Sequence, residues 1–332
     1  MELNNSMKIV LNDILKGKKS VALGGHVRPD GDCVGSCMGL YHYLREQYPD
    51  ICTDVYLEKV PEAYSIIKGT DEVKTQTDGG MVYDLFICLD CGDVQRLGFS
   101  GPLFENAKET LCIDHHISND AFADHNYIVP DASSTSELVY NIVDRDKISL
   151  ASAEALYMGI VHDTGVFQYS CTSPETMEAA ADLMRKGING SEIIDKTYYE
   201  KSYIQNQILG RALLESMLIM DKKCIVSVIR QKSMKFFQAK PSDLEGIVSQ
   251  LRQTKGVEVA IFLHEISPQH FKVSLRSKGK VDVSEIAQYY GGGGHVRAAG
   301  VTMEGSSHDV INNITARIAL QLKHEEGQDE EK

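Results

Sequence analysis

The first residues able to do chemistry form a short cluster of one imidazole and two carboxylates. His26, Asp30 and Asp32 lie close together, directly after an apolar segment typical of a buried strand. Divalent cations of hard or borderline character prefer this mixture of oxygen and nitrogen ligands. Because Asp30 and Asp32 are two residues apart, an extended turn would let them serve two neighbouring ions. For a single Asp here, the alternative is an Asx turn and a helix cap.

Two other apolar segments also end in polar residues. Asp90 closes the run DLFICLD, and a carboxylate at the end of a buried strand is costly unless a cation or hydrogen-bond donors compensate it. The alternative interpretation of Asp90 is a surface residue just past the end of the sheet. Asp114, His115 and His116 follow the next such run. Adjacent imidazoles point in different directions, so we expect at most one to bind metal. The other could donate to a substrate phosphate, with Asp114 orienting it.

A fourth group, H-D-T-G, ends a helical pattern and offers Asp163 as a further ligand. Taken alone, it is an ordinary helix C-terminus that Gly165 ends. The strand ends of a parallel sheet open onto one crevice, however, so the separate groups can meet. The candidate ligands for two ions that share Asp90 are therefore His26, Asp30, Asp32, Asp90, His115 and Asp163.

A pair of divalent ions at this place would indicate which reaction the protein catalyses. Divalent ions ~3.5–4 Å apart generate a hydroxide and stabilise both the attacking and the leaving oxygens of a phosphoryl displacement. The oxygen-rich ligand set favours Mn²⁺ or Mg²⁺ over structural zinc, and the imidazoles favour Mn²⁺. The sequence therefore predicts a phosphohydrolase.

The C-terminal half carries a basic, glycine-rich set that would suit an anionic substrate. Glycine backbone lets N–H groups approach an anion closely, and Arg276 can pair bidentately with a phosphate. We expect a substrate-binding loop here, the alternative being a flexible glycine linker. The candidate substrate-binding residues are Arg276, Gly292, Gly293, Gly294, His295 and Arg297.

Alternating strands and helices must position the metal ligands. Strands separated by helices indicate a parallel sheet, followed by a nearly all-helical region from about 134 to 216. A second strand-bearing unit then begins. The expected strands are 20–25, 53–57, 84–90, 110–114, 223–230, 257–266 and 271–276, and the clearest helices are 33–47, 152–162, 174–186, 203–217 and 308–323.

Composition narrows the class of protein. At 332 residues, two domains are the better expectation. The net charge of −13 argues against a protein that grips long duplex nucleic acid and favours a small substrate caught locally. Eight scattered Cys suit reduced thiols, and the C-x-x-C of Cys88 and Cys91 lacks the second pair that a zinc site needs. Without a membrane-spanning run or a signal peptide, we expect a cytoplasmic protein.

Four stretches carry a resemblance to a known family: H-V-R-P-D-G-D-C-V-G-S, D-H-H, H-D-T-G-V-F and G-G-G-G-H-V-R-A-A-G. In this order they resemble the DHH phosphoesterase superfamily with its DHH-associated C-terminal domain, over about residues 8–322. The compact length is similar to the nanoRNase/pAp phosphatase group. The resemblance implies an α/β fold with an N-terminal parallel-sheet domain, a smaller C-terminal mixed-sheet domain and an active site in the cleft. The expected division is 1–190 for the catalytic domain, 191–205 for a linker, 206–324 for the substrate domain and 325–332 for an acidic disordered tail.

The resemblance also implies roles for single residues. It assigns His116 to the scissile phosphate, and Arg276 with the segment 292–295 to the terminal nucleotide or phosphate of the substrate. The implied manganese ligands are His26 and Asp30 for one ion and Asp32, His115 and Asp163 for the other, with Asp90 bridging.

The resulting hypothesis is hydrolysis of RNA of two to five nucleotides, together with dephosphorylation of 3′-phosphoadenosine 5′-phosphate (pAp) to AMP. The substrates are short RNA and small nucleotides, with no long duplex and no membrane partner, and a homodimer is left open. The alternatives are a cyclic- or linear-dinucleotide phosphodiesterase, an inorganic pyrophosphatase and a nucleotide-binding regulator with a dead site. Manganese dependence would separate the enzymes from the regulator.

Overall fold

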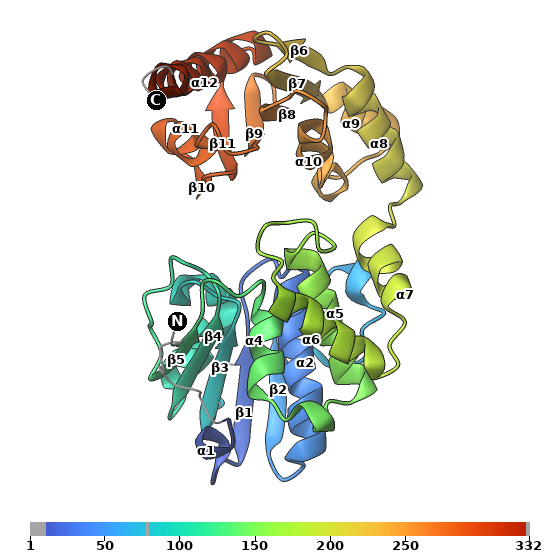
Figure 1. Cartoon of the computed structure of the whole chain (residues 1–332), viewed down its shortest axis with the longest axis vertical. Coiled ribbons are helices and arrows are strands. Elements are labelled where there is room, and N and C mark those ends of the chain that lie inside the picture. The colour runs from blue at the N-terminus through green and yellow to red at the C-terminus, as the bar shows by residue number, and fades with distance from the viewer. Residues whose placement is uncertain (1–10, 78–79, 330–332) are drawn as a thin grey trace. The chain divides into compact units, whose positions relative to one another are not determined.

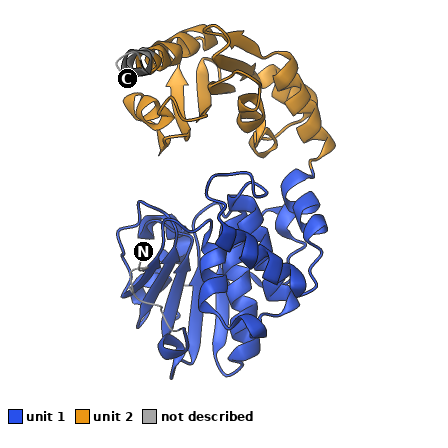
Figure 2. Cartoon of the chain, in the orientation of Figure 1, with its two compact units in different colours: residues 1–200 blue, residues 201–332 orange. Residues whose placement is uncertain are grey.

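A computed structural model describes residues 11–77 and 80–329 of the chain. The chain divides into two compact units, residues 1–200 and 201–332 (Figure 2). The division lies within the segment 191–205, where we expected a linker. Much of that segment is regular structure of the first unit, since α7 (Gly190–Ile194) continues into a π-helical turn (Asp195–Tyr199).

The first unit is built on the predicted parallel sheet, whose strand order is β2-β1-β3-β4-β5 (Figure 1). In this doubly wound order, the crevice for a ligand lies beyond the carboxyl ends of β1 and β3. β5 was not predicted, because its residues are only half-buried and lack an apolar run. The strands are β1 (Ser20–Gly24), β2 (Cys52–Tyr56), β3 (Leu85–Leu89), β4 (Thr110–Asp114) and β5 (His125–Ile128).

Both faces of this sheet are covered, which explains why β3 and β4 are continuous apolar runs. Leu23 and Ile87 point to one hydrophobic core, and Ala22 and Phe86 point to a second core on the opposite face. The larger core includes helices α2 (Gly31–Gln47), α4 (Thr135–Ile142), α5 (Leu150–Asp163) and α6 (Pro174–Arg185). The smaller core includes the 3₁₀ segment η3 (Val94–Ser100) and α3 (Gly101–Asn106).

Glycines bring α2 and α5 unusually close together. A Cβ added to Gly35 of α2 would lie 2.6 Å from the carbonyl oxygen of Ala155 and 2.8 Å from the nitrogen of Gly159, both on α5. This approach matters for the site, because α2 carries Asp32 in its first turn and α5 ends at Asp163.

The second unit contains the expected mixed sheet, with strand order β10-β11-β9-β8-β7-β6. β7 and β8 are parallel and the other neighbours are antiparallel. The strands are β6 (Met217–Ile219), β7 (Cys224–Ile229), β8 (Val259–Ser267), β9 (His270–Ser277), β10 (Gly293–His295) and β11 (Ala298–Glu304). The helices are α8 (Tyr203–Leu214), α9 (Gln231–Phe237), α10 (Ile247–Arg252), α11 (Val283–Tyr289) and α12 (Ser307–Asp329).

Two expectations for this unit were wrong in part. The helix expected to reach residue 217 ends at Leu214, and Met217 begins β6. The tail expected to be disordered from residue 325 is helical through Asp329, while 330–332 lie outside the described residues. Glu and Gln, which are common there, are good helix formers and extend a helix that is already nucleated.

Two further expectations concern location and redox state. None of the helices in the described ranges combines the length and the apolar character needed to cross a membrane. All eight cysteines are free thiols, as predicted.

Replacing Gly35 with Ala should destabilise the first unit by about 1–3 kcal/mol, because the added methyl group meets the backbone of α5. Thermal or urea unfolding would measure the change. Gly210→Ala is the matched control, since no atom lies within 4 Å of its added Cβ on α8 and only the gain in helix propensity remains. Equal unfolding free energies for the two variants would contradict close packing of α2 against α5.

Candidate metal centre

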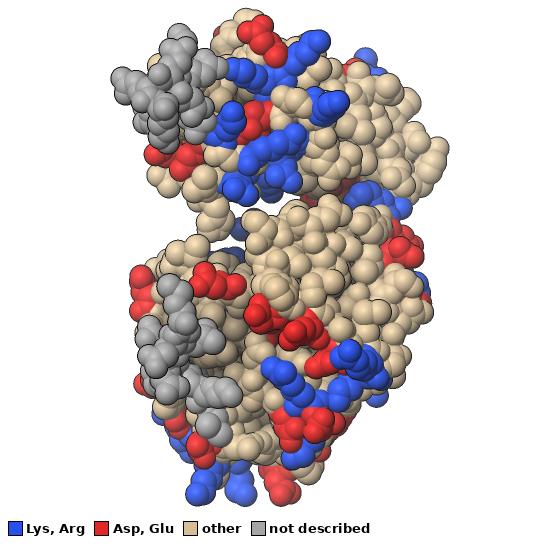
Figure 3. All heavy atoms as spheres, viewed as in Figure 1, with Lys and Arg blue, Asp and Glu red and all other residues tan. Residues whose placement is uncertain are grey.

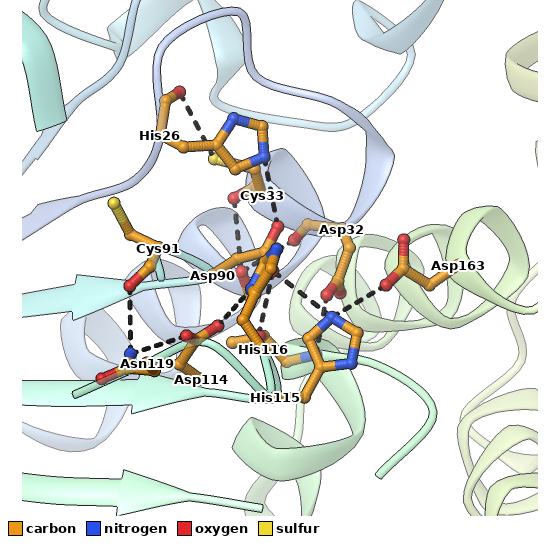
Figure 4. Close-up of polar contacts among 12 residues, drawn as sticks. His26, Asp32, Cys33, Asp90, Cys91, Asp114, His115, His116, Asn119 and Asp163 are labelled. Atoms are coloured by element: carbon orange, nitrogen blue, oxygen red, sulfur yellow. Dashed lines mark hydrogen bonds and ion pairs between the residues drawn. The ribbon is translucent and has the colours of Figure 1, made fainter. Parts of the chain in front are cut away.

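Asp90 lies at the middle of the site (Figure 4). It follows β3 with a left-handed backbone, φ 54°, and its residue is only 2% exposed. One carboxylate oxygen lies 3.4 Å from Nε2 of His26, and the other lies 3.6 Å from Nε2 of His115 and 3.7 Å from Nδ1 of His116. Its two oxygens therefore face different imidazoles, as a ligand shared by two ions would. Strained backbone of this kind persists where the surrounding structure fixes it.

His26 and Asp30 form one side of the centre. The Nδ1–H of His26 donates to the carbonyl of Val27 at 2.9 Å, which leaves Nε2 facing Asp90 and, at 3.6 Å, Asp30. Asp30 also caps α2, because its Oδ1 accepts from the amides of Asp32 and Cys33 at 3.1 Å each. The helix-cap role is thus present, and it coexists with proximity to His26.

Asp32, His115 and Asp163 form the other side, and each offers an atom within 4.8 Å of the others. Nε2 of His115 lies 3.0 Å from Oδ2 of Asp163. Asp32 is fully buried, and its two oxygens accept from the amides of Thr135 at 2.7 Å and Ser136 at 2.9 Å. These amides belong to the first turn of α4, where the helix dipole favours a carboxylate.

A hydrogen-bonded chain holds His116 beside this centre. Its Nδ1–H donates to Oδ1 of the buried Asp114 at 2.7 Å. The other oxygen of Asp114 accepts from Nδ2 of Asn119 at 2.6 Å, and the same Nδ2 lies 3.2 Å from the carbonyl of Cys91. With Nδ1 occupied, Nε2 is the nitrogen of His116 that is left to face a substrate.

The electrostatics of the cluster suit cations. Burial raises the pKa of Asp32 well above its usual range, and Asp90 and Asp163 add to the shift. Burial also raises the pKa of Asp163 to about 6. Burial opposes protonation of His26, but Asp30 and Asp90 together raise its pKa to about 11. So many carboxylates in a desolvated place are stable only with positive charge among them, and divalent ions would supply it.

All six predicted metal ligands therefore lie together in the first unit, although Asp30 is at the rim, with a side chain 57% exposed. Cys33 lies within 4.8 Å of His26 and Asp90 as well. His162, the neighbour of Asp163, points elsewhere, because its Nε2 hydrogen-bonds Thr197 at 3.1 Å.

The sequence missed two contributors to this centre. Asn119 orients Asp114, and Thr135 donates its hydroxyl to Asp90 at 3.2 Å besides binding Asp32 through its amide. The pattern S-T-S-E at 134–137, a helix start, was the available signal for Thr135. Nothing in the sequence singles out Asn119.

The predicted substrate residues lie in the second unit, and their glycine run is only partly a loop, because Gly291 and Gly292 precede a strand that Gly293 begins. Gly293 to His295 form the edge strand β10, paired with β11. A Cβ at Gly292 or Gly294 would lie 2.3 or 2.4 Å from backbone oxygens of β11, so close packing requires these two glycines. Gly291 and Gly293 have open space at their Cβ positions. His295 and Arg297 are exposed, and Arg276 lies on β9.

A doubly wound sheet whose strand ends gather carboxylates and imidazoles around Asp90 suits a metal-dependent hydrolase of phosphate esters. Residues 20–160 match the N-terminal domain of the DHH family, and residues 221–324 match the DHHA1 domain. The chain belongs to the DHH phosphoesterases.

Three similar proteins match the chain over nearly their whole length. The chain is 28% identical to the bifunctional oligoribonuclease and PAP phosphatase NrnA of Bacillus subtilis, over 92% of this chain and 96% of that protein. It is also 28% identical to NrnA of Thermus thermophilus, over 91% and 90% of the two chains. The crystal structure of an exopolyphosphatase-related protein from Bacteroides fragilis superposes with a TM-score of 0.84 at 26% identity, covering 95% and 94% of the two chains.

Removing the shared carboxylate should abolish stabilisation by metal. For the wild type, Mn²⁺ at about 100 times its Kd should add about 2.7 kcal/mol to the free energy of unfolding. Asp90→Asn should lose that increment, which thermal unfolding with and without Mn²⁺ would detect. Asp71→Asn, at an exposed Asp of the same unit, is the control and should keep it. Full metal stabilisation in Asp90→Asn would overturn the assignment of this centre.

Asn119 should act as a positioning residue. Asn119→Ala leaves one oxygen of Asp114 without its donor and loosens His116, so turnover should fall about 10–100-fold while metal stabilisation is retained. Steady-state kinetics and metal-dependent unfolding on the same preparation would separate the two effects. Asn106→Ala, at an asparagine outside the centre, is the control. Unchanged kcat in Asn119→Ala would refute the role.

Proposed function

We propose that the protein is a manganese-dependent phosphoesterase that degrades short oligoribonucleotides to mononucleotides and removes the 3′-phosphate of pAp. One observation carries the proposal. The two oxygens of buried Asp90 face His26 on one side and His115 on the other, where Asp32 and Asp163 also converge. That arrangement suits a pair of ions more than a single one.

When bound, two divalent cations would bring positive charge to the phosphoryl group and make a water molecule more acidic. The chain's own residues hold and orient the reacting groups. His26, Asp30, Asp32, Asp90, His115 and Asp163 are the proposed ligands. Mn²⁺ suits this imidazole and carboxylate set, with Mg²⁺ as the alternative ion.

His116 is the proposed catalytic donor to the phosphoryl oxygen. Burial opposes its protonation, but the hydrogen bond to Asp114 and the charge of Asp90 raise its pKa. An imidazolium whose Nδ1 is held by Asp114 presents its Nε2–H in a fixed direction. It therefore donates to charge that develops on the phosphate.

The substrate class rests on the relatives and on charge. Both NrnA relatives are named for oligoribonucleotide and pAp cleavage, the two activities proposed here. Residues 1–200 contain 32 Asp and Glu against 16 Lys and Arg, whereas residues 201–332 contain 15 against 18. Figure 3 shows Lys and Arg side chains gathered on part of the visible face of the second unit. Arg276 and His295, with the exposed edge at Gly293, are the proposed contacts to the terminal phosphate or nucleotide.

A substrate panel tests this function. With Mn²⁺ present, rates should be high on a diribonucleotide and on pAp, low on a long single-stranded RNA and lowest on a cyclic dinucleotide. Ion-exchange chromatography of the products would measure each rate. Chelation of the metal and Asp90→Asn serve as controls and should both remove turnover. The fastest rate on the cyclic dinucleotide would instead assign the protein as a cyclic-dinucleotide phosphodiesterase.

A further inference from the structure

The strand register of the second unit separates two faces of its sheet. Along β9, Phe271, Val273 and Leu275 are buried in the core that includes residues of α11 and α12. Side chains alternate along a strand, so Lys272, Ser274 and Arg276 lie on the opposite face. The cross-strand partners on that face are Thr302, Gly300 and Ala298 of β11 and His264, Phe262 and Ala260 of β8.

Helices cover only part of this second face. The core packed there joins β7 and β8 to α8 and α10, and among the residues that the structure describes it contains none from β9 or β11. Ser274, Ala298 and Gly300 are accordingly only half-buried, while Lys272 and Thr302 are exposed. The β9–β11 half of this face is therefore open to solvent.

The open half has a shallow floor with basic side chains at its two ends. Ser274, Ala298 and Gly300 are small, and a Cβ added to Gly300 would meet only ordinary contact, at 3.4 Å. Arg276 and Lys272 are four residues apart on the same side of β9, which separates their Cα atoms by about 13 Å. That distance exceeds the reach of one phosphate group and allows contacts to different parts of one oligonucleotide.

His264 offers a second polar group beside Lys272 on this face. Its residue is 9% exposed and pairs with Lys272 across the strands, and its ring makes no hydrogen bond to another described residue. Burial and the charge of Lys272 lower the pKa of His264, so its ring is neutral, with one donor and one acceptor to offer. The ring nitrogens of His264 are not among the fully buried atoms that lack a partner, so they reach the open, basic surface and can hydrogen-bond a polar ligand there.

We propose that Lys272 and His264 form a second nucleotide-contacting position on the open face of β9, beyond Arg276. Lys272 pairs with a phosphate of the chain, and His264 hydrogen-bonds the adjoining nucleotide. The position is reached only by a substrate longer than one nucleotide. It therefore favours oligonucleotides over pAp, and it deepens the proposed function, on which it rests.

The test compares Lys272→Ala with wild type in the holoenzyme, with pAp, a diribonucleotide and a tetraribonucleotide as substrates. Loss of one exposed phosphate contact should lower kcat/KM for the tetranucleotide about three- to tenfold, while the rate on pAp is unchanged. The salt dependence of tetranucleotide binding to the Asp90→Asn protein, measured by anisotropy, should lose about 0.7 from its slope when Lys272→Ala is added. His264→Phe should likewise impair only the longer substrates.

Lys222→Ala is the matched control, because Lys222 is an exposed lysine in the turn before β7, on the side of the sheet away from β11. It should change neither the rates nor the salt slope. Equal losses on pAp and on the tetranucleotide, or no loss on either, would overturn the second position while leaving the phosphoesterase function intact. Absence of cleavage of every oligonucleotide by the wild type would instead refute the proposed function.

Discussion

Burial of the Asp90 carboxylate is the constraint around which the first unit is organised. A carboxylate that is 2% exposed needs compensation, and it is surrounded by three imidazoles. Parallel pairing of β1 with β3 and of β3 with β4 brings His26, Asp90 and His115 to the same end of the sheet. Asp90 adopts a left-handed backbone conformation at this strand end, which is strained for a residue other than glycine.

The other contacts of the centre hold its clustered side chains in place. The amides at the start of α4 fix Asp32, a carbonyl fixes the ring of His26, and Asp114 with Asn119 fixes His116. Close packing of α2 on α5 places the helix whose first turn carries Asp32 against the helix that ends at Asp163. Such supports are what make metal affinity and catalytic geometry reproducible.

The two units differ in charge. The acidic first unit concentrates carboxylates that suit cations, and the second unit carries slightly more Lys and Arg than Asp and Glu. In the sheet of the second unit, successive side chains of β9 point to opposite faces. One side of β9 is packed in the core, and the other side is left available to a ligand.

The sequence alone determined the α/β class, four strands of the parallel sheet and all six residues that gather at the centre. It could do so because buried parallel strands are continuous apolar runs and polar residues at their ends are conspicuous. Only the tertiary structure decided the rest. β5 and β10 carry no apolar run, since their stability comes from neighbouring strands, and Gly292 and Gly294 serve packing against β11. Thr135 acts through contacts with Asp32 and Asp90, which are distant in the chain, and Asn119 links nearby Asp114 to the distant carbonyl of Cys91; long-range contacts leave no local pattern.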